Sequence, residues 1–558
     1  MVKKWWQEAV VYEIYCKSFC DSNGDGIGDL GGVMRKLPML KELGINCIWF
    51  TPIYKSPQVD NGYDVADYYN IDPAYGTLED FKKLLDIAHG MGIRVIMDQV
   101  LNHSSDECVW FQESRKSKDN PYRNFYIWQP PKPDGSEPNN WGNRFREGNG
   151  SAWTFDELTG EYYLHQYSAK MPDLNWEYEP LRQEIYRMLR FWLDLGVDGF
   201  RLDVFTRLKK PVGLPDSYNA SNPELDRGGY ILDNSMCTCV EGIHEILHDI
   251  WANVFGPADC YTVGEGSGIN AGNAASYIAP EAEQISSVYH FNLSSRKREP
   301  FTHAQFRKVQ SDWAKLHEAG CWATQYFSNH DSQRQVSHYG NDGVYRVPSA
   351  KLLAALTLTT PGTPYLYQGE EMGMVNVQFD AIEDYNCRYT LGDYRAMVEQ
   401  GTDPITAIRT VGPRSRDNAR TPYQWDASDN AGFTTGKPWI KVNPSYKEIN
   451  LEADRNSGDS IFTYYQKLIA LRKTHPAILD GDLHFHLEDS EQLLVYTRTC
   501  PEEMMLVIAN KSNESAEFAL PESLKKEIWQ PILMNCSEEA PLPDAPMAPW
   551  ECRIYARK

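Results

Sequence analysis

Four acidic residues follow short apolar segments at positions that lie far apart in the sequence. They are Asp98, Asp203, Glu265 and Asp331. A carboxylate at the end of an apolar strand is costly to bury alone, so each of the four could belong to a structural ion pair. Four such groups at one rim of a fold are harder to explain by ion pairing, and we expect them to take part in one reaction.

Two carboxylates of this kind can cleave a glycosidic bond. One attacks the anomeric carbon or positions a water molecule, and the other protonates the leaving oxygen. Arg201 stands two residues before Asp203, so both side chains point to the same face of a strand. Its charge would keep Asp203 ionised. His103 and His330 offer imidazole groups to sugar hydroxyls, although either one alone could be a buried core histidine.

The scaffold that must position these residues alternates strands with helices. The expected strands, rich in β-branched and aromatic residues, span residues 10–14, 46–50, 92–98, 197–200, 261–263, 288–291, 323–327 and 364–367. Amphipathic helices lie between them, one of which begins at the capping-box pattern Thr77 to Asp80 and another at Pro180. About eight parallel βαβ units favour an α/β fold closed into a (β/α)8 TIM barrel, where chemistry lies at the carboxyl ends of the strands.

Two segments depart from this alternation. Residues 105–174 are rich in Pro, Gly, Asn, Trp and Tyr and contain short strand-like pieces, which predicts a subdomain inserted after strand 3. From about residue 480, alternating apolar and polar runs predict a C-terminal antiparallel β domain. The expected division is a catalytic barrel of residues 1–104 and 175–479, an inserted subdomain of residues 105–174 and a C-terminal β-sandwich of residues 480–558.

The bulk composition excludes several classes of partner. The chain of 558 residues has a formal net charge of −22, so it should repel nucleic acid and anionic membrane surfaces. Its first residues do not resemble a signal peptide, and no apolar run is long enough to span a bilayer. The 12 cysteines are scattered, so we expect reduced thiols in a cytoplasmic protein. The isolated pair Cys237 and Cys239 does not predict a metal site.

Four segments around the acidic residues resemble the conserved segments of glycoside hydrolase family 13, in its oligo-1,6-glucosidase branch. The segments are residues 98–103, 199–204, 262–265 and 329–331. The resemblance covers essentially the whole chain. It implies that Asp203 is the nucleophile, that Glu265 is the general acid/base, and that Asp331 holds substrate hydroxyls together with His330.

The same resemblance extends to the sugar pocket. It implies that Tyr63 and Asp64 hold the terminal glucose, and that Arg416 pairs with Asp64 and closes the pocket beyond that glucose. A closed end explains exo action. A valine at position 204, directly after the nucleophile, implies a preference for α-1,6 linkages. The expected activity is therefore that of a retaining exo-α-glucosidase, monomeric or weakly oligomeric, acting on isomaltose, isomalto-oligosaccharides and panose.

A loop near the amino terminus alternates possible oxygen ligands with glycines, and it resembles the family's calcium or magnesium loop. The expected ligand positions are Asp21, Asn23, Asp25, Ile27 and Asp29. Such a loop suits a hard divalent cation, Ca²⁺ or Mg²⁺, in a structural role. The alternative is a polar turn in which the same side chains accept hydrogen bonds from their own backbone.

Three departures from the family pattern concern the leaving-group side. They are Met171, the pair Gly266-Ser267 and the pair Ser332-Gln333. The reaction stays the same, but α-1,4 linkages, sucrose or transfer to another sugar remain alternatives. Sucrose isomerases usually carry an Arg-rich loop after the fourth segment, and residues 338–342 contain no Arg.

Two further alternatives stay open. A phosphosugar hydrolase would need a basic cluster beside the leaving group, for which Arg207, Lys209 and Lys210 are the candidates, although such residues often form a solvated helix face. A non-catalytic sugar-binding relative would have lost at least one catalytic carboxylate, whereas Asp203 and Glu265 are both present.

Overall fold

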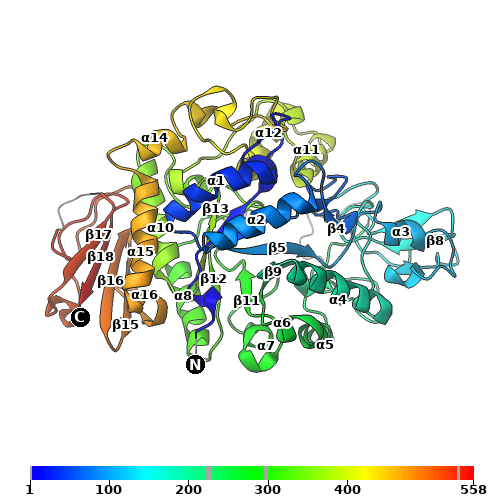
Figure 1. The fold of residues 1–558 in the computed structure, drawn as a ribbon, viewed down its shortest axis with the longest axis horizontal. Helices are drawn as coiled ribbons and strands as arrows, with labels where there is room; N and C mark the ends of the chain where they lie inside the picture. The colour runs from blue at the N-terminus through cyan, green and yellow to red at the C-terminus, as the bar shows by residue number, and fades with distance from the viewer. Residues whose placement is uncertain (1–2, 220–228, 295–298, 537–540, 558) are drawn as a thin grey trace.

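A computed structural model describes residues 3–219, 229–294, 299–536 and 541–557 of the chain (Figure 1). Eight parallel strands form one sheet in the order β11-β10-β9-β5-β2-β1-β13-β12. A parallel bridge between Val288 and Ala323 joins the two ends of this order and nearly closes the barrel. The strands are β1 (Val11–Ile14), β2 (Cys47–Phe50), β5 (Arg94–Val100), β9 (Gly199–Asp203), β10 (Tyr261–Gly266), β11 (Ser287–His290), β12 (Thr324–Gln325) and β13 (Thr363–Tyr367). The predicted TIM barrel is confirmed.

Helices surround the barrel and cover its strands. The longer ones are α1 (Leu30–Leu43), α2 (Leu78–Gly90), α4 (Glu179–Asp194), α5 (Ile243–Ile250), α8 (His303–Glu318), α10 (Arg346–Thr359), α11 (Arg388–Glu399), α12 (Pro404–Val411) and α15 (Ile461–Thr474). The capping box predicted for α2 is present, because the Thr77 hydroxyl accepts from the Asp80 amide and the Asp80 carboxylate accepts from the Thr77 amide. Local sequence therefore sets where this helix begins.

Large aromatic side chains fill the interior of the barrel. Tyr289 and Tyr326 stack with their ring centroids 3.6 Å apart, and Trp49 and Tyr365 pack edge-on against Tyr289. All four residues are buried. The barrel is thus a packed core, as barrels of this size are, and only its carboxyl-terminal rim is open to a substrate.

The segment between β5 and α4 forms the inserted region, at the right of Figure 1. It holds α3 (Val109–Ser114) and a three-stranded antiparallel sheet in the order β6-β8-β7. The strands of this sheet are β6 (Trp128–Gln129), β7 (Trp153–Asp156) and β8 (Glu161–Leu164). A two-stranded sheet of β3 (Tyr54–Lys55) and β4 (Asp67–Ile71) precedes it in the chain. The exact boundaries at residues 104, 174 and 479 stay a prediction.

The C-terminal strands form an antiparallel domain, at the left of Figure 1. Its strands are β14 (Asp482–His486), β15 (Leu493–Cys500), β16 (Glu503–Asn510), β17 (Gln530–Met534) and β18 (Cys552–Arg557). Within the described residues they make one five-stranded sheet, not the two sheets of the expected sandwich. The barrel helices α8, α10 and α15 cover one face of this sheet, as a second sheet would in a sandwich. Leu494, Tyr496 and Val507 therefore belong to the main hydrophobic core.

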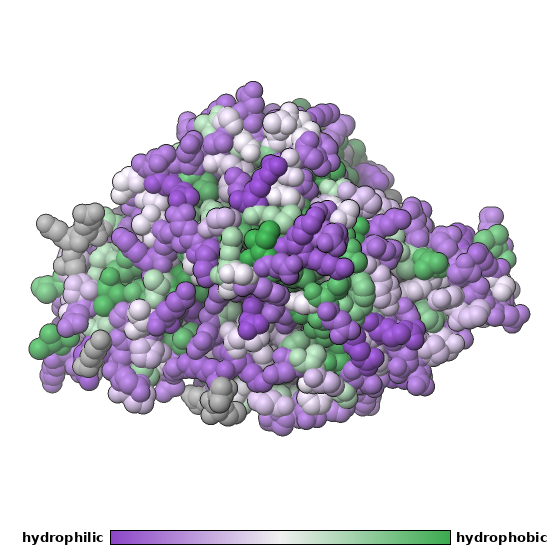
Figure 2. Space-filling view, in the orientation of Figure 1, coloured by the Kyte–Doolittle hydropathy of each residue, from purple (hydrophilic) through white to green (hydrophobic). Residues whose placement is uncertain are grey.

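The remaining α-helices of the described residues are short. They are α6 (Gly256–Ala258), α7 (Ala275–Ile278), α9 (Gln335–Tyr339), α13 (Asp417–Arg420), α14 (Leu451–Arg455), α16 (Pro476–Asp480) and α17 (Glu522–Lys525). The face drawn in Figure 2 is mainly hydrophilic, with smaller apolar areas between the charged side chains. None of the helices in the described ranges has the length and apolar character needed to cross a membrane.

Candidate active site

Arg201 joins three carboxylates from neighbouring strands at the rim of the barrel. One of its terminal nitrogens lies 2.8 Å from Asp98 and 2.6 Å from Asp203, and the other lies 2.8 Å from Glu265. These side chains come from β5, β9 and β10, which are adjacent in the sheet. Parallel strands end at one edge, so acids that are far apart in sequence meet there, as predicted.

The spacing of Asp203 and Glu265 is constrained twice. Both acids bind the same guanidinium, and the Val204 amide, which directly follows Asp203, donates to Glu265 Oε2 at 3.1 Å. Retaining glycosidases place their two carboxyl groups about 5–5.5 Å apart, and inverting ones about 6.5–9.5 Å apart. The two tethers hold both carboxylates beside one guanidinium, and whether the pair retains or inverts stays a prediction.

Val204 reaches this position through an unusual backbone conformation. Its φ is +35° and its ψ is +40°, in the left-handed region that β-branched residues avoid. Strain of this kind costs about 1–3 kcal/mol and persists only where the surrounding structure enforces it. Here the conformation points the amide of Val204 at the carboxylate of Glu265.

Asp331 lies in the loop between β12 and α9, beside two buried arginines, Arg416 and Arg420. Arg420 lies 2.5 Å and Arg416 lies 3.2 Å from the same carboxylate oxygen of Asp331. Arg420 also donates to the backbone carbonyl of His330. The Asp331 side chain remains 40% exposed, so its carboxylate stays accessible to a substrate hydroxyl.

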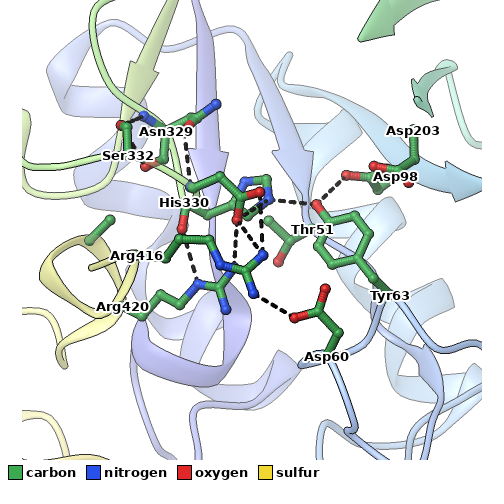
Figure 3. Close-up of polar contacts among 12 residues, drawn as sticks. Thr51, Asp60, Tyr63, Asp98, Asp203, Asn329, His330, Ser332, Arg416 and Arg420 are labelled. Carbon is green, nitrogen blue, oxygen red and sulfur yellow. Dashed lines mark hydrogen bonds and ion pairs between the residues drawn. The ribbon is translucent and has the colours of Figure 1, made fainter. Parts of the chain in front are cut away.

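A chain of buried polar side chains runs behind the sugar pocket. Tyr63 Oη donates to Asp98 and lies 2.7 Å from His330 Nε2, while His330 Nδ1 lies against Glu13 of β1 (Figure 3 shows the first two contacts). Tyr63 and His330 also stack, with their ring planes 13° apart. Burial lowers the pKa of His330 to about 3 and that of His103 to about 4, so both imidazoles are neutral in mildly acidic and neutral solution.

The expected pairing of Arg416 with Asp64 is wrong. Arg416 Nη2 lies 2.7 Å from Asp60, in the loop between β3 and β4 (Figure 3). Asp64 is fully buried, and its two oxygens accept the amides of Val59 and Asp60 at 2.7 and 2.9 Å. Asp64 therefore shapes the turn, and the turn presents Asp60 to Arg416.

A cavity of about 120 Å³ lies between these groups. Its walls include the predicted residues Tyr63, His103, Asp203, Val204, Glu265, Asp331 and Arg416, and also Asp60, Arg144, Phe145, Tyr167, Met171, Arg207, Ser267 and Tyr389. Arg201 and His330 lie behind the wall and contact residues that form it. Of the three departures from the family pattern, Met171 and Ser267 face the cavity, whereas the Ser332 hydroxyl closes a turn with Asn329.

Substitution of each aspartate of the turn by asparagine distinguishes the roles of Asp60 and Asp64. Asp60→Asn is expected to lower kcat/KM by about 10- to 100-fold, because a hydrogen bond to a charged group contributes about 1.5–3 kcal/mol. Asp64→Asn should mainly lower the free energy of unfolding, by about 1–3 kcal/mol, since an amide has one acceptor oxygen for two backbone donors. Steady-state kinetics and urea denaturation of both variants measure these effects. A loss of kcat/KM in Asp64→Asn with little loss in Asp60→Asn would mean that Asp64, and not Asp60, binds the substrate.

If Asp203 is the nucleophile, as the resemblance implies, it must be ionised to attack, and the acid limb of the pH–rate profile reports on its carboxyl group. Burial raises the pKa of Asp203, Arg201 opposes that rise, and the charges of Glu265 and Asp98 add to it. The rate should thus fall, on acidification, at a pH above the ordinary aspartate value of about 3.9. Arg201→Gln removes the opposing charge, so the limb in kcat/KM should move to higher pH.

A matched control for this shift is Arg94→Gln. Arg94 binds Asp198 2.7 Å away at the amino-terminal end of β9, so its removal should leave the limb in place. The neutral His103 and His330 do not contribute to the limb above pH 4. An unchanged limb in Arg201→Gln would mean that Arg201 does not set the ionisation of Asp203.

The glycine-rich loop near the amino terminus is held by its own hydrogen bonds. Asp21 accepts the amides of Asn23, Gly24 and Gly26, and Asp25 accepts the amide of Ile27. Asp29 accepts from Ser22 and caps α1. Across the described residues, no group of three His, Cys, Asp or Glu side chains is arranged to hold an ion. This geometry matches the polar turn, and cation binding stays a prediction.

Thermal unfolding distinguishes the two interpretations of the loop. If Ca²⁺ binds, a hundredfold excess over its Kd stabilises the fold by about 2.7 kcal/mol, so Tm should be higher with Ca²⁺ than with a chelator. Asp25→Asn keeps an oxygen for the Ile27 amide but loses the charge, and it should abolish the increase. Equal Tm values for the parent protein in both conditions would contradict the prediction.

Comparisons with known proteins agree with this geometry. The α-amylase catalytic-domain family matches residues 13–481. The chain is 46% identical to the oligo-1,6-glucosidase of Parageobacillus thermoglucosidasius, across 100% of this chain and 99% of that protein. It superposes on Bacillus licheniformis trehalose-6-phosphate hydrolase with a TM-score of 0.91 at 41% identity, covering 99% of this chain and 100% of that one. For a trehalulose synthase the values are 0.92 and 39%, with both chains fully covered. The chain belongs to the α-amylase family, glycoside hydrolase family 13, and is a glycoside hydrolase.

Proposed function

We propose that the protein is a retaining exo-α-glucosidase that removes glucose from the non-reducing end of short oligosaccharides. The observation that carries the proposal is the bridge of Arg201 to both Asp203 and Glu265, next to a pocket that Arg416 and Asp60 close. Relatives named oligo-1,6-glucosidase, at 44–46% identity over the full chain, support an α-glucosidase of this family.

The reaction proceeds in two displacements. Asp203 attacks the anomeric carbon while Glu265 gives its proton to the leaving oxygen, which forms a β-glucosyl ester and releases the leaving group. Glu265, now a carboxylate, takes a proton from water as that water attacks the same carbon and displaces Asp203. Two inversions leave the α configuration unchanged.

The terminal glucose occupies the closed end of the cavity. Asp60 and Asp331 accept its hydroxyls, and Arg416, which contacts both acids, holds them in place. Tyr63 offers a ring face of the kind on which a sugar packs, and stacking on His330 fixes its orientation. A chain cannot pass beyond the Arg416–Asp60 pair, so only a terminal residue fits.

The linkage preference rests on Val204 and on the names of the relatives. Purified protein offered isomaltose, panose, maltose, sucrose and trehalose should release glucose fastest from the α-1,6 linkages of isomaltose and panose. Faster turnover of maltose than of isomaltose would reject the linkage preference and keep the α-glucosidase. Formation of an isomer from sucrose would indicate instead an activity like that of the trehalulose synthase that the chain resembles.

The state of the cysteines bears on the cellular compartment. All 12 cysteines are free thiols, and nine of them are buried, which suits a reducing compartment such as the cytoplasm. We expect a monomer or a weak homo-oligomer. The substrate is a small oligosaccharide, and the net charge of −22 disfavours nucleic acid as a partner.

A further inference from the structure

Two arginines in the wall of the cavity have no carboxylate partner among the described residues, unlike the arginines Arg201 and Arg416 of the same site. Arg144 donates to Asn234 Oδ1 at 2.8 Å, and Arg207 donates to Asn234 Oδ1 and to Gln166 Oε1, each at 3.2 Å. Neither guanidinium forms an ion pair with any carboxylate of the described ranges. Neutral amide oxygens thus orient two cations that share one acceptor, Asn234.

The burial of the Arg207 charge is energetically unfavourable as it stands, whereas Arg144 is only partly buried. Arg207 is 2% exposed, and a buried charge is normally paired. By contrast, Arg201 contacts three acids and Arg416 contacts two. Burial and the neighbouring charge of Arg144 lower the pKa of Arg207 from its ordinary value. The pKa of Arg144 shifts the other way, because the neighbouring Tyr167 and Tyr389 outweigh its desolvation.

The pair lies on the leaving-group side of the catalytic acids. Arg207 ends the short helical turn Phe205–Arg207 that begins directly after Val204, whose amide contacts Glu265. Arg144 comes from the inserted region and lies over the ring of Tyr167. The Arg416–Asp60 pair closes the glucose end, so an arginine beside the acid/base meets the group that Glu265 protonates.

The two neighbouring lysines do not belong to this pair. Lys210 lies 3.1 Å from Asp173 and donates to Asn102, and Lys209 binds Glu177. The basic cluster considered from the sequence therefore reduces to Arg207, joined by Arg144, which sequence spacing did not indicate.

We propose that Arg144 and Arg207 bind an anionic group, a phosphate or a carboxylate, on the leaving group of the substrate. This inference rests on the proposed α-glucosidase function and adds the substrate class. Guanidinium groups bind either anion through paired N–H donors, and such charge-assisted contacts are about twice as strong as neutral ones. The anion supplies the negative charge that neither arginine finds among the described carboxylates, while the glucose at the closed end stays neutral.

Matched pairs of glucosides test the proposal, each pair sharing one linkage and differing only by an anion on the leaving group. Trehalose is compared with trehalose 6-phosphate, cleaved at the unphosphorylated ring, and α-glucosylglycerol with α-glucosylglycerate. The anionic member of at least one pair should have a kcat/KM higher by about 10- to 100-fold, and the advantage should shrink as ionic strength rises. The pair with the larger ratio identifies phosphate or carboxylate.

Arginine variants link that ratio to the two side chains. Arg207→Gln and, separately, Arg144→Gln should each lower the anionic-to-neutral ratio by about tenfold or more. Arg146→Gln is the matched control, since Arg146 pairs with Asp393 at 3.3 Å, and its ratio should not change. Equal rates for both members of both pairs would overturn the proposal, as would ratios that survive both substitutions.

Binding keeps the test independent of turnover. Calorimetry with the Asp203→Asn protein should give a Kd for trehalose 6-phosphate or α-glucosylglycerate at least about tenfold lower than for its neutral partner. Equal affinities would reject the anion site even if the enzyme is active. Preferential binding of an anionic glucoside by a parent enzyme that releases no glucose from any substrate would instead reject the proposed hydrolysis and keep the site.

Discussion

Asp203→Asn is expected to lower kcat for every substrate by at least about 10⁴-fold, a loss comparable to that caused by removing a covalent nucleophile from another hydrolase. Asn keeps the shape of the side chain and a hydrogen bond to Arg201 but cannot form the glycosyl ester. Asp198→Asn is the matched control on the same chain segment: Asp198 binds Arg94 and His89 at the opposite end of the barrel and should affect only stability. Steady-state assays on isomaltose measure both variants.

A small nucleophile can report which face of the sugar Asp203 occupies. In Asp203→Gly the vacated space admits azide, which attacks from the side where the carboxylate stood. The product should be β-glucosyl azide, formed in a single inversion from an activated α-glucoside. Full turnover by Asp203→Asn, or an α-azide from the glycine variant, would show that Asp203 is not the nucleophile.

Glu265→Gln should lower kcat/KM by about 10²- to 10⁴-fold for sugar leaving groups, the range that general acid–base catalysis contributes. A nitrophenyl leaving group needs little protonation, so the first displacement should suffer much less with that substrate. Azide added to Glu265→Ala should speed the second displacement, which needs no general base for an anion, and give α-glucosyl azide. An equal loss for both kinds of leaving group would contradict the assignment of Glu265 as acid/base.

The barrel could be predicted because its signals are local. Each buried strand is a short run of β-branched and aromatic residues, and all eight expected runs correspond to strands of the sheet. Strand lengths follow less directly from the sequence: residues 323–327 predict a full strand, yet β12 covers only Thr324–Gln325. The loop that follows must turn His330 and Asp331 towards the rim, and that requirement is not local.

Site residues at the ends of strands could be predicted from the sequence, whereas site residues in loops could not. Asp203 and Glu265 follow from strand ends, whereas Asp60 and Asp64 lie in one turn, and only the fold shows which carboxylate turns inward. Arg144 enters from the inserted region, and no sequence spacing relates it to Arg207. Glu13 meets His330 only because the barrel closes β1 against the strands of the last βα units.

The left-handed backbone conformation of Val204 sets thermal stability against the shape of the active site. Glycine and asparagine adopt a positive φ more easily than valine. A screen of variants for thermal stability alone should therefore favour either residue at position 204. Variants selected in this way would lack the branched side chain that lines the cavity beside Glu265, and we expect them to bind the leaving group less well. Valine at position 204 therefore provides this wall at a cost in folding free energy of about 1–3 kcal/mol.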